Sequence, residues 1–266
     1  MKASSSVPIQ PNNVTKGFII VDNVHKHYDM GEVKVLALNS INLSINRGEI
    51  VSIVGSSGSG KTTLLNIIGA LDYVDRGKII IDGHDLSSLT DKQLSYMRRE
   101  TIGYVFQNFN LLEELTAAKN IEMPMILTKK PKSERKKKVE ELLKIVNLDD
   151  RANHKPNQLS GGEQQRVAIA RALGNDIKII LADEPTGNLD SVTGNRIIDL
   201  LLRVSKEGNK TLIFVTHENH IAAKADRQIV MNDGLIIEDN IYCSGCGKKV
   251  NKSLIFCSSC GATFEE

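Results

Sequence analysis

The sequence predicts an α/β fold with a mainly parallel β-sheet that has helices on both faces. Three segments, Ile50–Val54, Lys178–Ala182 and Thr211–Val215, are rich in apolar residues, as strands buried on both faces are. Glycine-rich or helical sequence separates them. Strands that alternate with helices are typical of a parallel sheet, because parallel neighbours need long crossover connections.

Shorter signals define the remaining elements at the two ends of the fold. Phe18–Val21 is predicted to be a strand, and Thr62–Leu71 an apolar helix directly after a glycine-rich segment. Asp233-Gly234 lies between the apolar segments Ile229–Met231 and Leu235–Ile237, which predicts a tight β-hairpin.

Between about Gln93 and Leu173 the pattern is helical. One apolar stripe recurs at i, i+3, i+4 and i+7, at Val139, Leu142, Leu143 and Val146. A lysine- and arginine-rich run over residues 129–138 precedes this stripe. Acidic residues accompany the run and no aromatic residue interleaves, so we interpret it as a solvated helix face and not as a nucleic-acid or lipid site.

The bulk composition excludes several classes of function. The chain has 266 residues, of which 41% are hydrophobic and 25% charged, as in ordinary globular proteins. Its net charge of +2 argues against an electrostatic grip on nucleic acid or acidic lipid as the main function. No apolar run approaches the roughly 20 residues of a membrane-spanning helix. Residues 1–16 are polar and are predicted to be a disordered leader, not a secretory signal, so we expect a cytosolic protein.

The cysteines mark a second domain. All four lie at the C-terminal end, at Cys243, Cys246, Cys257 and Cys260. This change in composition predicts a boundary near Asn240, with a large domain over residues 17–240 and a small one over residues 241–266. The two Cys-x2-Cys knuckles lie ten residues apart, each followed by glycine, which is the spacing of tetrahedral four-cysteine zinc sites and resembles a zinc ribbon.

Two alternatives to zinc exist for this tail. Disulfides are disfavoured in a cytosolic chain, and iron in a rubredoxin-like site ranks second to zinc. A segment of about 25 residues buries too little surface to fold alone. Bound metal is therefore expected to supply its stability.

Residues 55–62 read Gly-Ser-Ser-Gly-Ser-Gly-Lys-Thr and fit the phosphate-binding pattern G-x-x-x-x-G-K-[ST] between a strand and a helix. The glycines let successive backbone N–H groups point at phosphate oxygens. Lys61 is placed for the β- and γ-phosphates, the Thr62 hydroxyl for Mg²⁺ and Thr63 for the α-phosphate. The predicted nucleotide contacts are Gly55, Ser56, Ser57, Gly58, Ser59, Gly60, Lys61, Thr62 and Thr63.

Polar residues near the predicted strands supply the chemistry. Asp183 and Glu184 end an apolar strand, where Asp183 is predicted to hold Mg²⁺ directly or from the outer coordination sphere. Glu184 is predicted to polarise the attacking water as general base. His217 follows another strand and is predicted to contact the γ-phosphate. Gln107 has a neutral side chain that would complete the Mg²⁺ shell.

A second anion site is predicted at Leu159–Glu163, which reads Leu-Ser-Gly-Gly-Glu. Ser160, Gly161 and Gly162 open a helix, and the first N–H groups of a helix have no partner inside it. The phosphate loop already holds its own nucleotide. Two anion sites in one domain raise the question of their geometry, which decides whether the chain can work alone.

From about Phe18 to Asn240 the chain resembles the nucleotide-binding subunit of ABC transporters. The motifs of that family occur in order: the phosphate loop at Gly55, the Q-loop at Gln107, the signature at Leu159, the strand acids, the D-loop at Gly187–Asp190 and the H-loop at His217. Tyr28 matches the aromatic position that stacks on adenine. The resemblance implies a P-loop NTPase fold with an antiparallel β subdomain and a helical signature subdomain.

A closer resemblance is to the lipoprotein-release and macrolide-export branch. It rests on the segments 106–112, 158–173 and 182–190. The chain departs from that branch at Glu113, Lys119 and Glu218, none of which is a phosphate-handling position. The first two lie near the surface that faces the permease in that branch, so they bear on the identity of the partner.

The resemblance also implies a mechanism. Two copies would meet head to tail on binding ATP and Mg²⁺, with Ser160, Gly161, Gly162, Glu163 and Asp190 reaching the nucleotide of the other copy. Glu184 and His217 would be catalytic. The homodimer would drive an integral-membrane permease from the cytoplasmic face of the membrane, and no nucleic acid is expected as partner.

Two other functions are weighed against ATP-driven transport. A regulatory clamp would dimerise on ATP and signal through a membrane partner without transport. A DNA-repair ATPase of the same fold would carry long insertions between phosphate loop and signature. Here only 104 residues separate Gly55 from Ser160, which disfavours that class.

Overall fold

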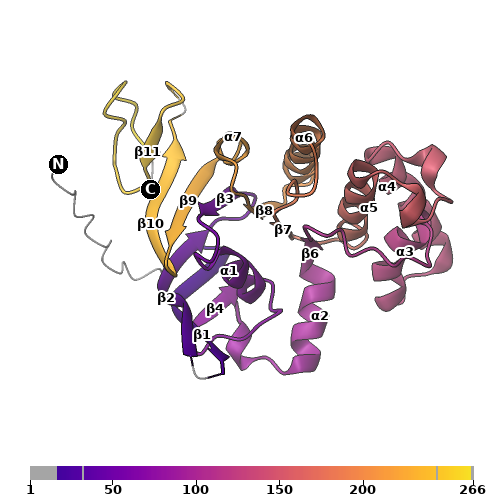
Figure 1. Ribbon diagram of the computed structural model, residues 1–266, viewed down its shortest axis with the longest axis horizontal. Coiled ribbons are helices and arrows are strands. Elements are labelled where there is room, and N and C mark those ends of the chain that lie inside the picture. Colours follow the sequence, from indigo (N-terminus) through magenta and orange to yellow (C-terminus); the bar gives the residue numbers. More distant parts are fainter. Residues whose placement is uncertain (1–16, 32, 244, 265–266) are drawn as a thin grey trace. The chain divides into compact units, whose positions relative to one another are not determined.

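The computed structural model describes residues 17–31, 33–243 and 245–264. The leader predicted for residues 1–16 lies outside the described residues. The chain forms two compact units (Figure 1). The first contains the N-terminal part up to Ser88 and the C-terminal part from His217, and the second is Leu89–Thr216.

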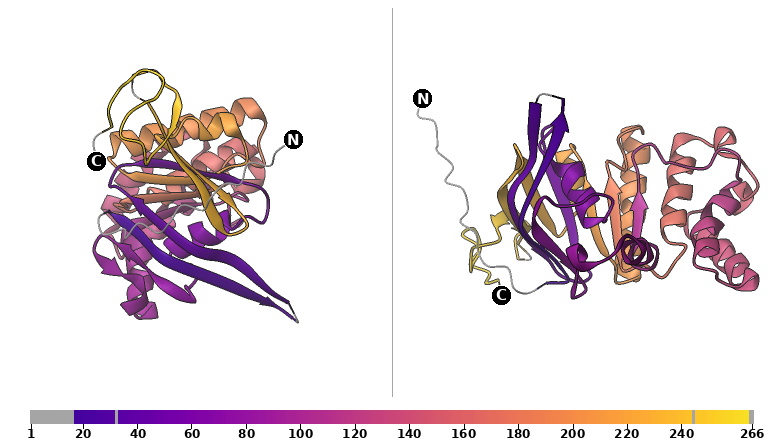
Figure 2. Two further views of the ribbon diagram at one scale, coloured as in Figure 1. Left: turned by 90° about the vertical axis from the view of Figure 1, so that its left-hand side faces the viewer. Right: turned by 90° about the horizontal axis from the view of Figure 1, so that it is seen from below.

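An antiparallel sheet occupies the N-terminal part of the first unit. It consists of β1 (Ile19–Met30), β2 (Val33–Ile45), β4 (Arg76–Ile81) and β5 (His84–Asp85), in the order β2-β1-β4-β5. β1 and β2 form a long hairpin, drawn in indigo in Figure 2. The sequence predicted only the start of β1, because the polar residues that continue the strand show no apolar alternation.

The other strands of the first unit include β3, which leads into the phosphate loop. In the order β11-β10-β9-β3 they are β11 (Lys249–Asn251), β10 (Leu235–Tyr242), β9 (Arg227–Asn232) and β3 (Ile50–Gly55), with β3 and β9 parallel. Asp233 and Gly234 have φ of 47° and 73° at the β9–β10 turn. Positive φ at both central residues is the type I′ conformation, which confirms the predicted hairpin.

Strand β10 runs through the predicted domain boundary without a break. Its residue Asn240 pairs with Gln228 of β9 on one side and with Asn251 of β11 on the other. Beside it, the buried guanidinium of Arg227 binds Asp239 at 2.6 Å and Glu49 at 3.0 Å. The cysteine-containing tail therefore continues the sheet of the first unit.

Three parallel strands form the sheet of the second unit, in the order β8-β7-β6. They are β6 (Ile102–Val105), β7 (Ile179–Asp183) and β8 (Thr211–Val215). β7 and β8 confirm the strands predicted at Lys178–Ala182 and Thr211–Val215. The prediction of helix throughout residues 93–173 is wrong at β6, where alternate residues are buried and the segment pairs with β7.

Each unit also contains helices. The first unit has α1 (Lys61–Ile68), the short α7 (Asn219–Ala222) and the 3₁₀ turn η1 (Leu86–Ser88). The second has α2 (Asp91–Thr101), α3 (Ala117–Leu127), α4 (Lys132–Ile145), α5 (Gly161–Ala172) and α6 (Ser191–Glu207), with 3₁₀ turns η2 (Asp149–Arg151) and η3 (Pro156–Gln158). Helices α3, α4 and α5 pack together (Figure 1), and the predicted stripe Val139, Leu142, Leu143 and Val146 is buried. Among the described residues no helix is long and apolar enough to cross a membrane.

Candidate nucleotide and metal sites

The phosphate loop connects β3 to α1 in the first unit. Gly58 and Gly60 have φ of 78° and 97°, left-handed values that turn the backbone N–H groups toward the loop interior. The buried Lys61 ammonium donates to the carbonyl oxygens of Gly55 at 3.1 Å and Ser56 at 2.7 Å. The lysine is thus folded over the loop, and α1 has no side-chain cap at its N-terminus. That N-terminus is built to receive an anion.

Tyr28, the residue predicted to stack on adenine, lies near this helix. Its hydroxyl donates to Asp72 at 2.6 Å and also interacts with Thr63. The ammonium of Lys26 lies 5.1 Å from the centre of the Tyr28 ring and forms an ion pair with Asp72 at 2.7 Å. Tyr28 is 37% exposed and leaves a surface for a planar base.

The pKa values of Tyr28 and Asp72 are shifted in opposite directions. Partial burial, and next the hydrogen bond to Asp72, raise the pKa of Tyr28. Burial also disfavours the charged form of Asp72, but hydrogen bonds from Lys26 and Tyr28 outweigh it and lower its pKa. Asp72 therefore stays ionised and holds both neighbours. Nothing in the sequence marks Asp72, which lies in a turn after α1.

In the second unit, three of the predicted Mg²⁺ and base residues, Gln107, Asp183 and Glu184, lie at the carboxyl ends of the strands. The fourth, Thr62, belongs to α1 of the first unit. β6 and β7 are parallel with Val105 opposite Ala182. Gln107, two residues after β6, and Asp183, the last residue of β7, therefore lie at the same end of neighbouring strands. Glu184 has a φ of 43°, which is uncommon for a residue other than glycine, and its N–H donates to the carbonyl of Val215 at 3.1 Å. Such conformations concentrate at functional sites.

The D-loop packs against the Q-loop in this unit. The Asn188 amide donates to the Gln107 carbonyl at 3.1 Å and to Asn108 at 2.9 Å. A Cβ added at Gly187 would lie 2.7 Å from the Gln107 amide nitrogen, so glycine allows the close approach. His217 directly follows Thr216, the last residue of the unit.

The signature segment caps helix α5. The Ser160 hydroxyl accepts from the Glu163 N–H at 3.3 Å, and the Glu163 carboxylate accepts from the Ser160 N–H at 2.8 Å. This is a complete capping box. The Ser160 backbone N–H, despite partial burial, and then Arg151 lower the pKa of Glu163.

A hollow of about 750 Å³ lies at this helix start. Its lining includes Ser160, Gly161, Gly162, Glu163 and Asp190. The carboxylate of Asp190 also caps α6, because it accepts from the N–H groups of Val192 and Thr193. The structure therefore brings together in one hollow every residue predicted to act on the other copy's nucleotide.

The four cysteines of the tail converge. Their sulfur atoms lie within 4.8 Å of one another, with Cys243 and Cys260 at 3.5 Å and Cys246 and Cys257 at 3.7 Å. A tetrahedral Zn–S distance of about 2.3 Å requires sulfurs about 3.8 Å apart. All four are free thiols. The residues present fit a tetrahedral thiolate site.

Both knuckles are built alike. The N–H of Gly247 donates to the Cys243 carbonyl at 2.7 Å, and that of Gly261 to the Cys257 carbonyl at 2.8 Å. Both glycines have left-handed φ, of 70° and 75°. Backbone N–H groups of Ser259 and Cys260 lower the pKa of Cys257 to about 6.

Known proteins resemble the chain over most of its length. Residues 38–187 match the family model described as ABC transporter. An uncharacterised ABC transporter ATP-binding protein of Thermotoga maritima is 50% identical over 214 residues, which cover 80% of this chain and 91% of that protein. The macrolide export ATP-binding/permease protein MacB of Shewanella oneidensis is 48% identical over 226 residues, which cover 85% of this chain and 34% of that longer protein.

A solved structure agrees with these sequence matches. The ATP-binding cassette MJ0796, a Methanocaldococcus jannaschii protein, in its dimeric post-hydrolysis state with ADP and Pi, matches with a TM-score of 0.78 and 48% identity. The match covers 84% of this chain and 98% of that one. The P-loop NTPase fold and ATP hydrolysis as its reaction, both predicted from the motifs, are confirmed. The chain belongs to the ABC transporter family, as an ATP-binding cassette.

Proposed function

We propose that two copies of the chain close head to tail on ATP and that each signature segment completes the site of the other copy. The observation that carries this proposal is the hollow at α5, which is lined by Ser160–Glu163 and Asp190. It presents helix N–H groups to a ligand, while the phosphate loop in the other unit forms an anion site by itself. The dimeric MJ0796 structure with ADP and Pi supports the transfer of this arrangement.

Within each composite site the residues take separate roles. Lys61 and the loop N–H groups bind the phosphates, and Tyr28 stacks on adenine. Thr62, Gln107 and Asp183 offer the hydroxyl, amide and carboxylate oxygens that Mg²⁺ prefers, and the ion would offset phosphate charge. Glu184 accepts a proton from the attacking water, and His217 contacts the γ-phosphate.

The dimer would power an integral-membrane permease from the cytoplasmic face of the membrane. A groove of about 330 Å³ in the second unit lies between β6, the Q-loop and α3. Its lining includes the exposed apolar side chains Leu112 and Leu127. An apolar groove that adjoins Gln107 would let a permease segment act on the nucleotide site. The similarity to MacB, whose name joins ATP-binding and permease functions, favours the macrolide-export and lipoprotein-release branch.

The tail over residues 241–266 is proposed to be a zinc ribbon attached to an ATP-binding domain over residues 17–240. Its core within the described residues is small: Cys243, Val250 and Cys257 are buried, with Ile241, Ala262 and Phe264 packed against them. Metal binding contributes about 10–16 kcal/mol in zinc-finger peptides. Purified protein should hold one zinc per chain, and Cys243→Ser with Cys257→Ser should lose it; metal-free parent protein would refute the ribbon.

Complementation between two inactive variants tests the composite site. Lys61→Ala removes the ammonium that binds the phosphates in the phosphate loop. Gly161→Asp places a carboxylate in the signature segment. Alone, each should be inactive. Mixed one to one, half of the dimers are mixed and contain one intact site each, so activity should recover to about a quarter of the parent value.

A matched control uses Lys61→Ala with Glu184→Gln. Both changes damage the half-site that belongs to the chain holding the nucleotide, so no mixed dimer contains an intact site and no activity should return. Recovery in this control, or none in the first mixture, would refute the head-to-tail arrangement.

Isolation of the tagged protein from membranes tests the permease. Transport predicts an integral-membrane partner that stimulates ATP hydrolysis and moves a substrate when both are reconstituted. Stimulation without movement would instead indicate a regulatory clamp. ATP hydrolysis stimulated by DNA, without a membrane partner, would indicate a repair-type ATPase.

A further inference from the structure

The turn between α3 and α4 combines concentrated positive charge with exposed apolar side chains. Residues 129–138 contain seven lysines or arginines and one acid, although the whole chain has a net charge of only +2. Immediately before them, at the end of α3, Ile126 is 42% and Leu127 is 54% exposed. Positive charge is therefore concentrated in one segment of the chain, which directly follows an exposed apolar pair.

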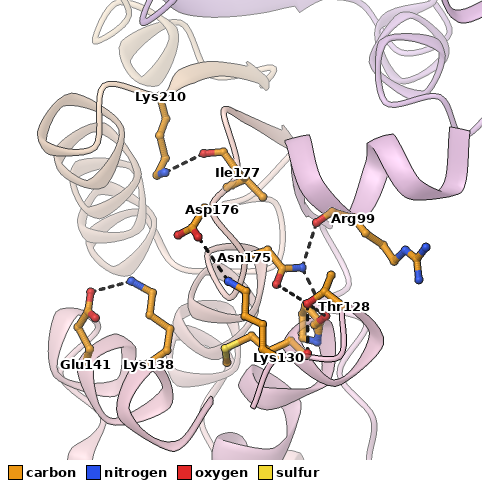
Figure 3. Close-up of polar contacts among 11 residues, drawn as sticks. Arg99, Thr128, Lys130, Lys138, Glu141, Asn175, Asp176, Ile177 and Lys210 are labelled. Carbon is orange, nitrogen blue, oxygen red and sulfur yellow. Dashed lines mark hydrogen bonds and ion pairs between the residues drawn. The ribbon is translucent and has the colours of Figure 1, made fainter. Parts of the chain in front are cut away.

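Ion pairs within the protein engage only part of this charge. Figure 3 shows Lys130 directed at Asp176, at 3.5 Å, and Lys138 at Glu141, at 2.7 Å. Arg135 binds Glu122 at 2.9 Å. The remaining four cations are exposed and make no ion pair within the part of the chain that the structure describes: Lys129, Lys132, Lys136 and Lys137. We name these four lysines with Ile126 and Leu127 the basic turn.

The backbone of the basic turn is firmly held. The Lys130 N–H donates to the Met125 carbonyl at 3.0 Å, which closes the end of α3. The buried Asn175 amide donates to the Arg99 carbonyl at 3.0 Å, and its oxygen lies 3.2 Å from the Thr128 hydroxyl (Figure 3). The turn therefore displays its side chains from a rigid base.

Lys129 occupies a position that favours glycine. Its φ is 59°, and a residue in this conformation at the end of a helix is usually glycine, because a Cβ there costs about 1–2 kcal/mol. The exposed lysine gains no ion pair within the described residues that would offset this cost. The conformation points to a function for the charge outside the folded chain.

We propose that the basic turn lies against anionic phospholipid headgroups beside the permease. The proposal rests on the function proposed above, since Leu127 also lines the groove assigned to the permease and the turn would then face the same membrane. Lysines attract the acidic leaflet, and the two aliphatic side chains enter the boundary between headgroups and acyl chains. Nucleic acid would use the lysines but has no complement to Ile126 and Leu127. The exposure of these two side chains revises the sequence-based interpretation of residues 129–138 as a merely solvated helix face.

Sedimentation with vesicles tests this contact on the full chain without permease or nucleotide. The protein should bind vesicles that contain phosphatidylglycerol, bind pure phosphatidylcholine much less, and dissociate as salt is raised. Each lysine removed should weaken binding about fivefold, so Lys132→Gln with Lys136→Gln should weaken it about 25-fold. The matched control, Lys92→Gln with Lys206→Gln on α2 and α6, should leave binding unchanged.

Lys129→Gly separates the contribution of Lys129 to vesicle binding from its effect on the stability of the fold. Glycine removes the charge and the unfavourable φ together, so binding should fall about fivefold while the chain becomes at least as resistant to urea as the parent. Ile126→Ser should weaken binding without changing its salt dependence. Equal binding to both vesicle types, binding insensitive to the lysine variants, or tighter binding to duplex DNA than to vesicles would overturn the proposal. None of these results bears on whether two copies complement in ATP hydrolysis.

Discussion

The phosphate loop before α1 and the signature segment before α5 both present a helix N-terminus, but glycine serves different purposes in them. Gly58 and Gly60 have left-handed φ and curl the backbone of the phosphate loop. Gly161 and Gly162 lie in helix α5, where a Cβ at Gly162 would approach the Thr193 Cγ2 to 2.5 Å. Glycine shapes the backbone in the first segment and clears space in the second.

The two helix starts also differ in capping. No side chain caps α1, whereas Ser160 and Glu163 form a capping box on α5. The N-terminus of α1 is left to a ligand, and that of α5 is already partly satisfied and carries a carboxylate. The phosphate loop is thus a site by itself, and the signature segment is suited to complete a site elsewhere.

The largest expected effect separates nucleotide binding from turnover. Glu184→Gln should bind ATP like the parent but hydrolyse it about 10²–10⁴-fold more slowly, because it removes the general base and leaves both anion sites intact. Single-turnover hydrolysis and equilibrium ATP binding measure the two quantities. Glu207→Gln, at the exposed end of α6, is the control and should change neither. Near-normal turnover of Glu184→Gln would exclude this residue as the base.

Alanine at the two kinds of glycine tests the comparison directly. A Cβ at Gly60 would lie 2.4 Å from the Ala37 carbonyl oxygen, at a φ of 97°. Gly60→Ala should lower the free energy of unfolding by more than about 2 kcal/mol and weaken ATP binding by the monomer. Gly162→Ala meets only the end of the Thr193 side chain, so its stability should change by less than about 1 kcal/mol.

The readout that distinguishes these glycines is ATP binding by the monomer, alongside urea unfolding. Gly162→Ala should leave that affinity unchanged and lower only the turnover of the dimer. If it weakened monomer binding as much as Gly60→Ala, the two segments would not differ in the way proposed.

The sequence predicted the parts of the fold that depend on short-range patterns. The strand before Gly55, the Asp233-Gly234 turn and the order of the motifs follow from residues close together in the chain. Asp72 and Asn175 could not be predicted, since each acquires its role from partners far away in sequence. Strand β6 was missed because four residues are too few to show a period against neighbouring helices.

Two capping boxes provide a matched pair for the signature. Thr90 caps α2 with Gln93 as Ser160 caps α5 with Glu163. Thr90→Ala and Ser160→Ala should each lower the free energy of unfolding by about 1 kcal/mol. Only Ser160→Ala should also lower ATP hydrolysis, because Ser160 alone is proposed to reach the nucleotide of the other copy. Equal hydrolysis by both variants would reduce Ser160 to a structural cap.

The smallest effect uses the acid in one of these boxes. The backbone N–H of Ser160, and after it the Ser160 hydroxyl, which donates to the carboxylate at 2.9 Å, lower the pKa of Glu163 below its ordinary value near 4.5. A depressed pKa in the folded state stabilises the fold above that ordinary value, and the contribution is lost as pH falls through the lower, folded value. The partner in the other box, Gln93, does not titrate. Ser160→Ala keeps the backbone N–H and removes only the hydroxyl that donates to the Glu163 carboxylate. Its cost should therefore shrink by a few tenths of a kcal/mol once acid protonates Glu163, while that of Thr90→Ala stays constant. Urea unfolding of the parent and both variants across acidic pH measures this difference. A parallel fall in both costs would mean that acid weakens the whole unit and that the charge of Glu163 adds nothing to the box.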